Sequence, residues 1–278
     1  MLDPDIKAAL TQAVRHAAAR EILPRFRNLS AADIASKTSR HDLVTEADTR
    51  AEAFLEDRIQ QILPGAFCLG EEKAAADPEI LDRFGREEIT VVIDPVDGTW
   101  NFAHGIASFA VIIAVMIGNQ PAWGMIYDPV CDDWIEASPG EGALFKRQGG
   151  SDCKLLPCAP QTSGPASELN GFIPVRQFAS CHQPELILAS YQFDQTFSIR
   201  SSAHEYRMLA LGTMDFSITS GTKPWDHVAG QIILAETGGA SARLDGQPYD
   251  PRLNAPLVFA RCPQTLEVAM AEFSFLSD

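Results

Sequence analysis

The sequence predicts a layered fold of mixed α-helices and β-strands. Stretches with apolar residues at helical spacing alternate with short, continuously apolar stretches in both halves of the chain. Hydrophobic residues make up 46% of the 278 positions and charged residues 21%, which provides enough apolar material for a large core. This pattern favours one large or two smaller globular domains, and no internal repeat is present.

Two amphipathic helices are predicted in the first part of the chain. One begins at Asp3-Pro4, because aspartate can cap a helix and proline suits its first position, and Pro24 should end or kink it. The other follows the sequence DLVTEAD at 42–48 and ends before the Pro-Gly pair at 64–65. Its apolar stripe consists of Ala47, Ala51, Leu55, Ile59 and Ile62.

The next segments are predicted to be strands. They are ITVVID (89–94), which is rich in β-branched residues, and the buried-type stretches SFAVIIAVMI (108–117) and AWGMIYD (122–128). A β-hairpin is predicted for DWIEASPGEGALFK (133–146), with its turn at the Pro-Gly pair 139–140.

Gly, Ser and Pro become frequent at residues 149–170, so we place a domain boundary near the start of this stretch. The boundary separates a domain 1–148 from a domain 149–278. In chain order, the elements predicted for the second domain are a strand ELILASY (185–191), a helix near 202–212, a helix opened by KPWDHVAGQIILAETGG (223–239) and stopped by its two last glycines, an Asp-Gly turn in ARLDGQPYD (242–250), a strand PLVFARC (256–262) and a closing helix PQTLEVAMAEFSFL (263–276).

Composition argues against several classes of protein. The formal net charge is −15, which disfavours an unspecific nucleic-acid binder, because such proteins need basic patches. The same charge repels a phosphate-bearing substrate unless local cations reverse the field. No apolar run has membrane-spanning length and the N-terminus lacks a signal-peptide pattern, so we expect a cytoplasmic protein. The six cysteines form no Cys-x-x-Cys pair and are expected to be buried or free thiols.

The stretch VVIDPVDGTWNF carries the first chemical signal. Asp94 and Asp97 leave the predicted strand through a rigid proline turn, which can aim both carboxylates and the carbonyl of Val96 into one pocket. Gly98 lets the backbone approach a bound group, and Thr99 can open a short helix whose N–H groups attract an anion. The stretch could therefore bind hard cations and a phosphate side by side, although aspartates in turns also serve as caps.

Other acidic residues strengthen this interpretation. Asp48 lies in LVTEAD, Glu71 in GEE, and Asp226 in a Trp-Asp pair that opens a helix, where a plain N-cap is the alternative. Taken together and in this order, the segments resemble the inositol monophosphatase family, within a superfamily of lithium-sensitive, magnesium-dependent sugar and nucleotide phosphatases. The resemblance covers about residues 37 to 250, and its segments are Lys37, DLVTEAD (42–48), GEE (70–72), DPVDGTWNF (94–102), GMIYDPVCDDWIEASPGEGALF (124–145) and WDHVAGQIILAETGG (225–239).

The resemblance implies a five-layered αβαβα sandwich that forms a homodimer and acts as a Mg²⁺-dependent phosphoric monoester hydrolase. The implied ligands of one Mg²⁺ are Glu71, Asp94 and the carbonyl of Val96, and those of a second are Asp94, Asp97 and Asp226. A third, weaker site near Glu71 is also implied, and Mn²⁺ could replace Mg²⁺. Oxygen ligands of this kind are the ones that Mg²⁺ prefers.

The resemblance also implies catalytic roles. Asp48 and Thr99 match the pair that orients and activates the attacking water, close to the metal held by Glu71. The backbone N–H groups of Gly98 and Thr99 match the phosphate cradle. Two metals about 4 Å apart can activate the water on one side and stabilise the leaving alkoxide on the other.

Several nearby residues are expected to play lesser roles. Glu72 is expected to lie beside the ligands or to be a solvated helix residue rather than to bind the metal. His104 and His227 flank the site motifs, but magnesium does not seek imidazole, so both are interpreted as structural or substrate-side residues.

The substrate side departs from the family pattern. Arg200 stands where members that prefer inositol phosphate commonly have glycine, and Thr219 stands where they have a glutamate that binds sugar hydroxyls. Arg200 either adds a cation at the pocket wall, suited to a second phosphate or a carboxylate, or points to solvent or to a dimer interface. Trp100, where the family usually has a smaller residue, either packs under the turn or touches the substrate. Ser202 is a third substrate-side candidate.

These observations predict a Mg²⁺-dependent phosphomonoesterase that hydrolyses a small phosphorylated alcohol by a metal-activated water. Inositol phosphate, histidinol phosphate, sugar phosphates and nucleotides such as 3′-phosphoadenosine 5′-phosphate stay open as substrates. We predict that myo-inositol 1-phosphate is hydrolysed but is not the best substrate. The alternative from another class is a regulatory binding role beside the transcription or ribosome-maturation machinery.

Overall fold

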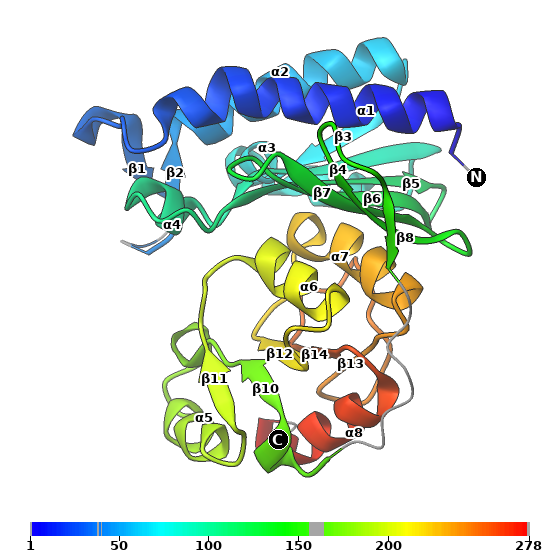
Figure 1. The fold of residues 1–278 in the computed structure, drawn as a ribbon. Helices are drawn as coiled ribbons and strands as arrows, with labels where there is room; N and C mark the ends of the chain where they lie inside the picture. The colour runs from blue at the N-terminus through cyan, green and yellow to red at the C-terminus, as the bar shows by residue number, and fades with distance from the viewer. Residues whose placement is uncertain (1, 38, 40, 156–163, 277–278) are drawn as a thin grey trace.

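The computed structural model describes residues 2–37, 39, 41–155 and 164–276, which are stacked in five layers (Figure 1). One pair of helices covers the outer face of a seven-stranded sheet, a second pair lies between this sheet and a five-stranded sheet, and a third pair lies beyond the five-stranded sheet. In the order of these layers, the helices are α1 (Pro4–Ala17), α2 (Glu46–Ile62), α6 (Ser202–Ala210), α7 (Pro224–Glu236), α5 (Gln183–Ser190) and α8 (Pro263–Glu272). This is the layered αβαβα arrangement that the sequence predicted.

The seven-stranded sheet follows the chain from one edge to the other. Its strand order is β3-β4-β5-β6-β7-β8-β9, in which β3 and β4 are parallel and all other neighbours are antiparallel. Helices cover both faces, so every residue of β4 after Ile89 is buried. The strands are β3 (Phe67–Gly70), β4 (Ile89–Asp97), β5 (Ala110–Ile117), β6 (Gln120–Asp128), β7 (Asp133–Ser138), β8 (Gly142–Arg147) and β9 (Cys153–Leu155).

The five-stranded sheet has the order β11-β10-β12-β14-β13. Its first three strands are parallel, and β14 is antiparallel to both of its neighbours. The strands are β10 (Asn170–Phe172), β11 (Gln195–Phe197), β12 (Phe216–Thr219), β13 (Ala240–Arg243) and β14 (Leu257–Ala260). The remaining elements are a small hairpin of β1 (Ile34–Ser36) and β2 (Leu43–Thr45) before α2, and two short helices, α3 (Glu71–Ala76) after β3 and α4 (Thr99–Ala103) after β4.

Helix α7 is held closely between the two sheets. A Cβ atom at Gly124 of β6 would lie 2.7 Å from the Cα of Ala229, and one at Gly230 would lie 2.2 Å from the Tyr206 ring of α6. Side chains other than hydrogen at these two positions would push α7 away from its neighbours. The tight packing fixes the start of α7, where Asp226 stands, relative to the end of β4.

Most predicted elements agree with the structure, but one prediction was wrong. The segment 185–191 was expected to be a strand and instead belongs to α5. Pro184 suits the first turn of a helix, and the inward-facing Leu186 and Ala189 are three residues apart, whereas Leu188 is exposed. The burial follows helical spacing, which a short apolar run does not reveal by composition alone.

Other sequence expectations fall on loops and boundaries. Helix α1 continues through a π-helical turn and a 3₁₀ turn at Leu23–Arg25, so the chain leaves the helix just after Pro24, as predicted. The domain boundary near residue 149 stays a prediction: β9 extends the first sheet beyond it, residues 156–163 lie outside the described residues, and α6 and α7 form a layer between both sheets.

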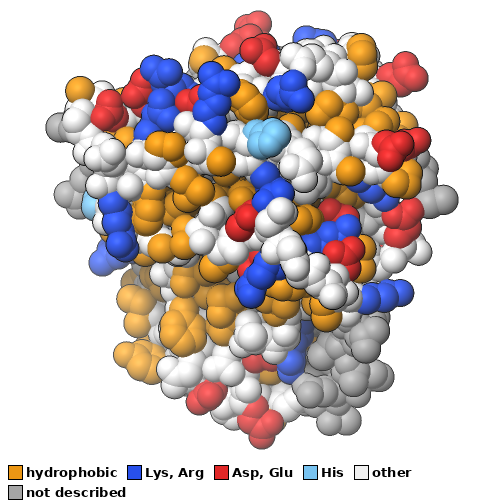
Figure 2. Space-filling view, turned by 45° about the horizontal axis from the view of Figure 1, so that its top comes forward, with side chains coloured by type: hydrophobic (Ala, Val, Ile, Leu, Met, Phe, Trp, Pro, Cys, Tyr) orange, Lys and Arg blue, Asp and Glu red, His pale blue; other side chains and the backbone are white. Residues whose placement is uncertain are grey.

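The surface carries mixed charge on the face that Figure 2 shows. Lys and Arg side chains stand among Asp and Glu side chains there, above an area of apolar side chains. Among the described residues, no helix combines the length and the apolar character needed to cross a bilayer.

Candidate active site

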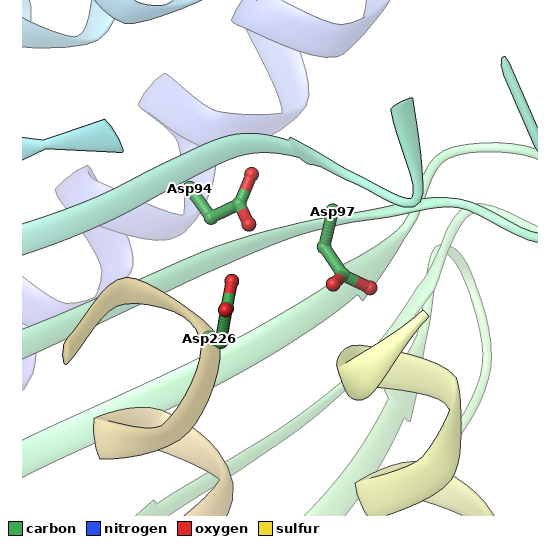
Figure 3. A group of neighbouring side chains, drawn as sticks. All are labelled: Asp94, Asp97 and Asp226. Atoms are coloured by element: carbon green, nitrogen blue, oxygen red, sulfur yellow. The ribbon is translucent and has the colours of Figure 1, made fainter. Parts of the chain in front are cut away.

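Three carboxylates meet where the end of β4 faces the start of α7 (Figure 3). Asp94 and Asp97 come from β4 and Asp226 from the first turn of α7, and one carboxylate oxygen from each lies within 4.8 Å of the others. Residues three apart in a regular strand point to opposite faces. The pairing of β4 with β5 shifts register between Asp94 and Asp97, and this bulge brings both carboxylates to the same side.

The cluster is electrostatically costly as it stands. Burial raises the pKa of each of the three aspartates, to about 8 at Asp226, and the charge of Glu71 raises the pKa of Asp94 and Asp226 further. Among the described residues, no lysine or arginine forms an ion pair with any of the three. Buried carboxylates of this kind need a cation, and an all-oxygen donor set suits a hard divalent ion such as Mg²⁺.

Asp97 is also held by the N-terminus of α6. Its carboxylate accepts hydrogen bonds from the backbone N–H groups of Ser202 and Ala203, at 3.1 and 3.0 Å, and from the hydroxyls of Ser201 and Ser202. These bonds partly offset the effect of burial on its pKa. Ser202, predicted as a substrate-side residue, lines the same cavity and donates to Asp97 at 2.8 Å, while its predicted contact with substrate stays a prediction.

Glu71 opens α3 and lines the same cavity as the three aspartates. The Nζ of Lys37 donates to Glu71 at 2.9 Å and to Glu72 at 2.7 Å, so one ammonium bridges two neighbouring carboxylates. The two glutamates raise the pKa of Lys37 although burial acts in the opposite direction. Glu72 is turned toward Lys37 and is absent from the described lining of the cavity, in keeping with the lesser role expected for it.

Glu52 supports Glu71 and was missed by the sequence interpretation. Its two carboxylate oxygens accept the backbone N–H groups of Glu72 and Lys73 at 2.9 and 2.8 Å, which caps the N-terminus of α3. A Cβ at Gly70 would lie 2.2 Å from the Glu52 carboxyl carbon, so the glycine makes room for the cap. The sequence signal that could have identified Glu52 is its position on the buried, largely apolar face of α2, where a carboxylate needs a hydrogen-bond partner.

Thr99 and Asp48 form a pair at the edge of the cavity. The Thr99 hydroxyl lies 3.0 Å from a carboxylate oxygen of Asp48 and 3.0 Å from the carbonyl oxygen of Val96. Thr99 lines the cavity, whereas Asp48 is fully buried behind it and accepts further hydrogen bonds from the backbone and hydroxyl of Thr45. Burial raises the pKa of Asp48 to about 6 against the opposing effect of these bonds. A hydrogen-bonded carboxylate of this pKa is ionised near neutral pH and can accept a proton through Thr99.

The cavity has a volume of about 1450 Å³ and brings nearly all predicted site residues together. The predicted residues that line it are Glu71, Asp94, Val96, Asp97, Gly98, Thr99, Arg200, Ser202, Thr219 and Asp226. At its base, Gly98 adopts a φ of +87°, and a Cβ there would lie 2.8 Å from the carbonyl oxygen of Ser108. Only glycine fits this turn without strain, so the backbone before α4 is open to a bound group.

On the predicted substrate side, the cavity is lined by Thr219, Arg200 and Trp100, and Thr219 stands where a glutamate is considered typical of the family. The hydroxyl of Thr219 donates to the carbonyl of Gly221 at 3.0 Å, so its hydrogen is used within its own turn. The guanidinium carbon of Arg200 lies 4.6 Å from the ring centre of Trp100. Both Arg200 and Trp100 line the cavity, and their contact with substrate stays a prediction.

The two histidines that flank the motifs have separate environments. His104 is exposed and stacks on Trp100, with ring centres 3.9 Å apart. His227 is buried, its Nδ1 lies 2.9 Å from the Tyr206 hydroxyl, and burial lowers its pKa to about 4. His227 also lines the cavity, so both positions agree with the structural or substrate-side roles expected for them.

The chain is similar to known proteins over nearly its whole length. The model of the inositol monophosphatase family matches residues 2–275. An inositol-1-monophosphatase of Bacillus subtilis (strain 168) is 32% identical over 236 residues, which cover 85% of this chain and 84% of that protein. A fructose-1,6-bisphosphatase/inositol-1-monophosphatase of Thermotoga maritima is 27% identical, with 77% of each chain covered. The structure of inositol monophosphatase II from Staphylococcus aureus MSSA476 has the same fold, with a TM-score of 0.80 at 24% identity over 99% of this chain and 95% of that one.

Proposed function

The chain belongs to the inositol monophosphatase family and is a phosphoric monoester hydrolase, and we propose that it hydrolyses a small phosphorylated alcohol with the help of Mg²⁺. The observation that carries this proposal is that three aspartates from β4 and α7 share one cavity with Thr99, whose hydroxyl contacts the buried carboxylate of Asp48. Hydrolysis of a phosphate ester by water requires a cation site and a proton acceptor that the water can reach, here through Thr99.

The proposed metal ligands are those that the resemblance to the family implies, and all of them line the cavity. Glu71, Asp94 and the carbonyl of Val96 would hold one ion, and Asp94, Asp97 and Asp226 a second, with a third, weaker site near Glu71. The donor set contains only oxygen, and the aspartates lack a described cationic partner, so the residues fit Mg²⁺, with Mn²⁺ as a substitute. When bound, such ions act as Lewis acids that lower the pKa of water and neutralise the charge of the phosphoryl group.

The Asp48–Thr99 pair would orient the attacking water. Thr99 Oγ1 reaches the cavity and can accept a hydrogen from this water, while its own proton moves toward the carboxylate of Asp48, 3.0 Å away. Asp48 is held in place by Thr45, so the direction of the proton acceptor is fixed before substrate binds. Preorganisation of this kind lowers the barrier without rearrangement at the moment of reaction.

Gly98 and Thr99 would hold the phosphate. The positive φ of Gly98 and the absence of a side chain leave the N–H groups at the start of α4 accessible to phosphate oxygens. The phosphate would then lie beside the three aspartates and their cations, with Thr99 next to the phosphorus.

The identity of the alcohol stays open among inositol phosphate, histidinol phosphate, sugar phosphates and nucleotides. The internal hydrogen bond of Thr219 supports our prediction that myo-inositol 1-phosphate is hydrolysed without being the best substrate. The homodimer, the sensitivity to Li⁺ and a regulatory binding role stay predictions that rest on the resemblance. The cytoplasmic location stays a prediction that rests on the sequence pattern.

A panel of phosphate esters tests the proposal. We expect phosphate release that requires Mg²⁺ or Mn²⁺, disappears with a chelator and is inhibited by Li⁺. The variant Asp94→Asn should lose nearly all turnover, because it removes the carboxylate shared by both proposed metal sites. Metal-independent hydrolysis, or an Asp94→Asn variant with more than about a tenth of the wild-type kcat, would contradict the proposed mechanism.

A further inference from the structure

Arg200 is one of three lysine and arginine side chains in the described lining of the cavity, and the other two are Arg176 and Lys223. Among the described residues, no carboxylate forms an ion pair with it, and burial alone lowers its pKa. One Nη2 hydrogen is donated to the carbonyl of His41 at 3.2 Å, while the buried Nε has no hydrogen-bond partner. A guanidinium carries five N–H donors and stays charged in proteins, so most of its donors are left for a ligand.

The guanidinium is held by an aromatic stack. Its central carbon lies 4.6 Å from the ring centre of Trp100, and His104 stacks on Trp100 with ring centres 3.9 Å apart. The Nδ1 of His104 lies 2.7 Å from the Trp100 carbonyl oxygen, which ties the imidazole to α4. A cation over an indole ring is attracted to the ring face, and this attraction fixes the position of the guanidinium.

The backbone at Arg200 is fixed and strained. Its φ is +55°, a left-handed value that glycine adopts freely and arginine does not. The side-chain amide of Asn101 donates to the carbonyl of Ile199 at 2.7 Å and lies 3.4 Å from that of Arg200, so α4 holds this conformation. A non-glycine residue kept in such a conformation at a cavity wall indicates that its side chain has a function there.

Arg200 also lies beside the proposed phosphate site, but its side chain reaches the rim. A Cβ at Gly98 would lie 3.3 Å from the carbonyl oxygen of Arg200, so the two backbones touch. The guanidinium extends from this contact to His41, an exposed residue in the connection between β1 and β2. The cation is therefore placed near the phosphate but outward of the buried Asp94 and Asp97.

We propose that the alcohol part of the substrate carries a second anionic group, a phosphate or a carboxylate, which binds the guanidinium of Arg200, and that Trp100 is a positioning residue for this arginine. The proposal rests on the proposed phosphatase function and narrows its substrate class. The planar fork of an arginine matches the oxygens of either group, and its charge offsets the repulsion that the aspartate cluster exerts on an anion.

Two matched pairs of esters test this proposal. Glycerol 2-phosphate and 2-phosphoglycerate differ by a carboxylate, and fructose 1-phosphate and fructose 1,6-bisphosphate differ by a second phosphate. In at least one pair, we expect the wild-type protein to have the higher kcat/KM for the ester that carries the second anionic group. A preference in the first pair indicates a carboxylate, and a preference in the second pair indicates a phosphate.

The variant Arg200→Gln should lower kcat/KM for the preferred ester by about 10- to 100-fold, mainly through KM, and leave its matched partner within about threefold. Arg200→Lys, which keeps the charge without the planar fork, should lose less. Trp100→Leu should reduce the preference by about tenfold, and Trp100→Phe, which keeps an aromatic face, should restore most of it. Arg86→Gln, at an exposed arginine outside the described lining of the cavity, is the control.

Two results would overturn the proposal. Equal losses for both members of each pair would assign Arg200 to the shared phosphate, and unchanged kinetics in Arg200→Gln would leave it without a role in recognition. Hydrolysis of glycerol 2-phosphate shows that the phosphatase function holds whichever result is obtained. If the wild type released phosphate from none of the esters, the proposed phosphatase function would be wrong. Calorimetric titration with the same esters would then still compare the binding affinities of the wild type and Arg200→Gln.

Discussion

The hydroxyl of Thr99 lies 3.0 Å from the carboxylate of Asp48, and Asp48 is completely buried behind it. Of the two residues only Thr99 lines the cavity, so its hydroxyl connects the cavity to the buried carboxylate of Asp48. In the proposed mechanism Thr99 faces the substrate and Asp48 accepts the proton, and neither residue is a proposed metal ligand.

We therefore expect Thr99→Ala to lower kcat by about 100-fold while Mg²⁺ affinity changes little, the usual scale for a positioned proton-transfer group. Thr99→Ser keeps the hydroxyl and should retain most of the activity. Calorimetric Mg²⁺ titration beside steady-state kinetics checks both variants. A Thr99→Ala protein that lost metal binding together with turnover would show that Thr99 maintains the structure of the site instead.

The pKa of Asp48 predicts an acid limit for activity. Burial raises this pKa to about 6 in the metal-free protein, and only the ionised carboxylate can accept a proton. A cation held by Glu71 favours the ionised form, so at saturating Mg²⁺ kcat should fall at a pH between the ordinary aspartate value of 3.8 and about 6. A pH profile of kcat measures this limit, and a profile that stayed flat down to about pH 4 would exclude Asp48 as the proton acceptor.

The aspartate cluster should make the metal-free protein less stable at high pH. The pKa of Asp226 is about 8 in the folded state and has an ordinary value of 3.8, so between these values the folded protein holds a proton that the unfolded chain has released. The free energy of unfolding must then fall as the pH rises through this range. Asp226→Asn mimics the protonated form, and it should exceed the wild type in stability by at least about 1 kcal/mol near pH 9 but not near pH 4.

Thermal unfolding of the metal-free proteins at both pH values tests this expectation, with the exposed Asp57→Asn as the control. The same Asp226→Asn variant should lose the stabilisation that Mg²⁺ gives the wild type, because a neutral amide is a weaker ligand. A variant that lost stability at every pH would indicate that Asp226 caps α7 and does not serve a metal.

Glu52 should contribute to stability and to the metal site together. Glu52→Gln replaces a carboxylate that accepts two backbone N–H groups of α3, so we expect a loss of about 1–2 kcal/mol in the free energy of unfolding and weaker Mg²⁺ binding. Glu56→Gln is the matched control, because Glu56 lies one turn later on α2 and, within the described part of the chain, pairs with the Lys73 side chain and caps no helix. Equal effects of the two variants in denaturant unfolding would contradict the capping role of Glu52.

Thr219 offers a test of substrate selection. A glutamate at this position would present a carboxylate to the cavity, whereas the hydroxyl of Thr219 donates its hydrogen bond to the carbonyl of Gly221. Thr219→Glu should therefore raise kcat/KM for myo-inositol 1-phosphate relative to other esters by about 10- to 100-fold, the scale of charge-assisted hydrogen bonds. Thr219→Gln, with the same length but no charge, should give a smaller gain. No relative gain in either variant would show that position 219 does not select the alcohol.

The sequence determined the parts of the site that are continuous in the chain. The strand, the turn and the start of α4 around Asp94, Asp97 and Gly98 follow from β-branched residues, a proline and a glycine that must adopt a positive φ. The resemblance to the family pointed to Glu71 and Asp226, and the structure places both in the lining of one cavity. The resemblance also predicted the αβαβα fold, which the similarity to solved structures confirms. Local residue patterns depend on backbone conformation and burial, so they were sufficient to predict the strand, the turn and the helix start of this part of the site.

Only the tertiary structure decided how distant segments support one another. Three contacts join segments that are separate in the sequence. Glu52 caps α3, the N-terminus of α6 donates hydrogen bonds to Asp97, and Arg200 lies over the ring of Trp100. The apolar run at 185–191 lies largely in helix α5 and not in a strand, because the side that is buried depends on the sheet against which the segment packs. A periodic pattern reports which side of a segment is buried, but the partner on that side is set by packing between layers, which no local stretch of sequence encodes.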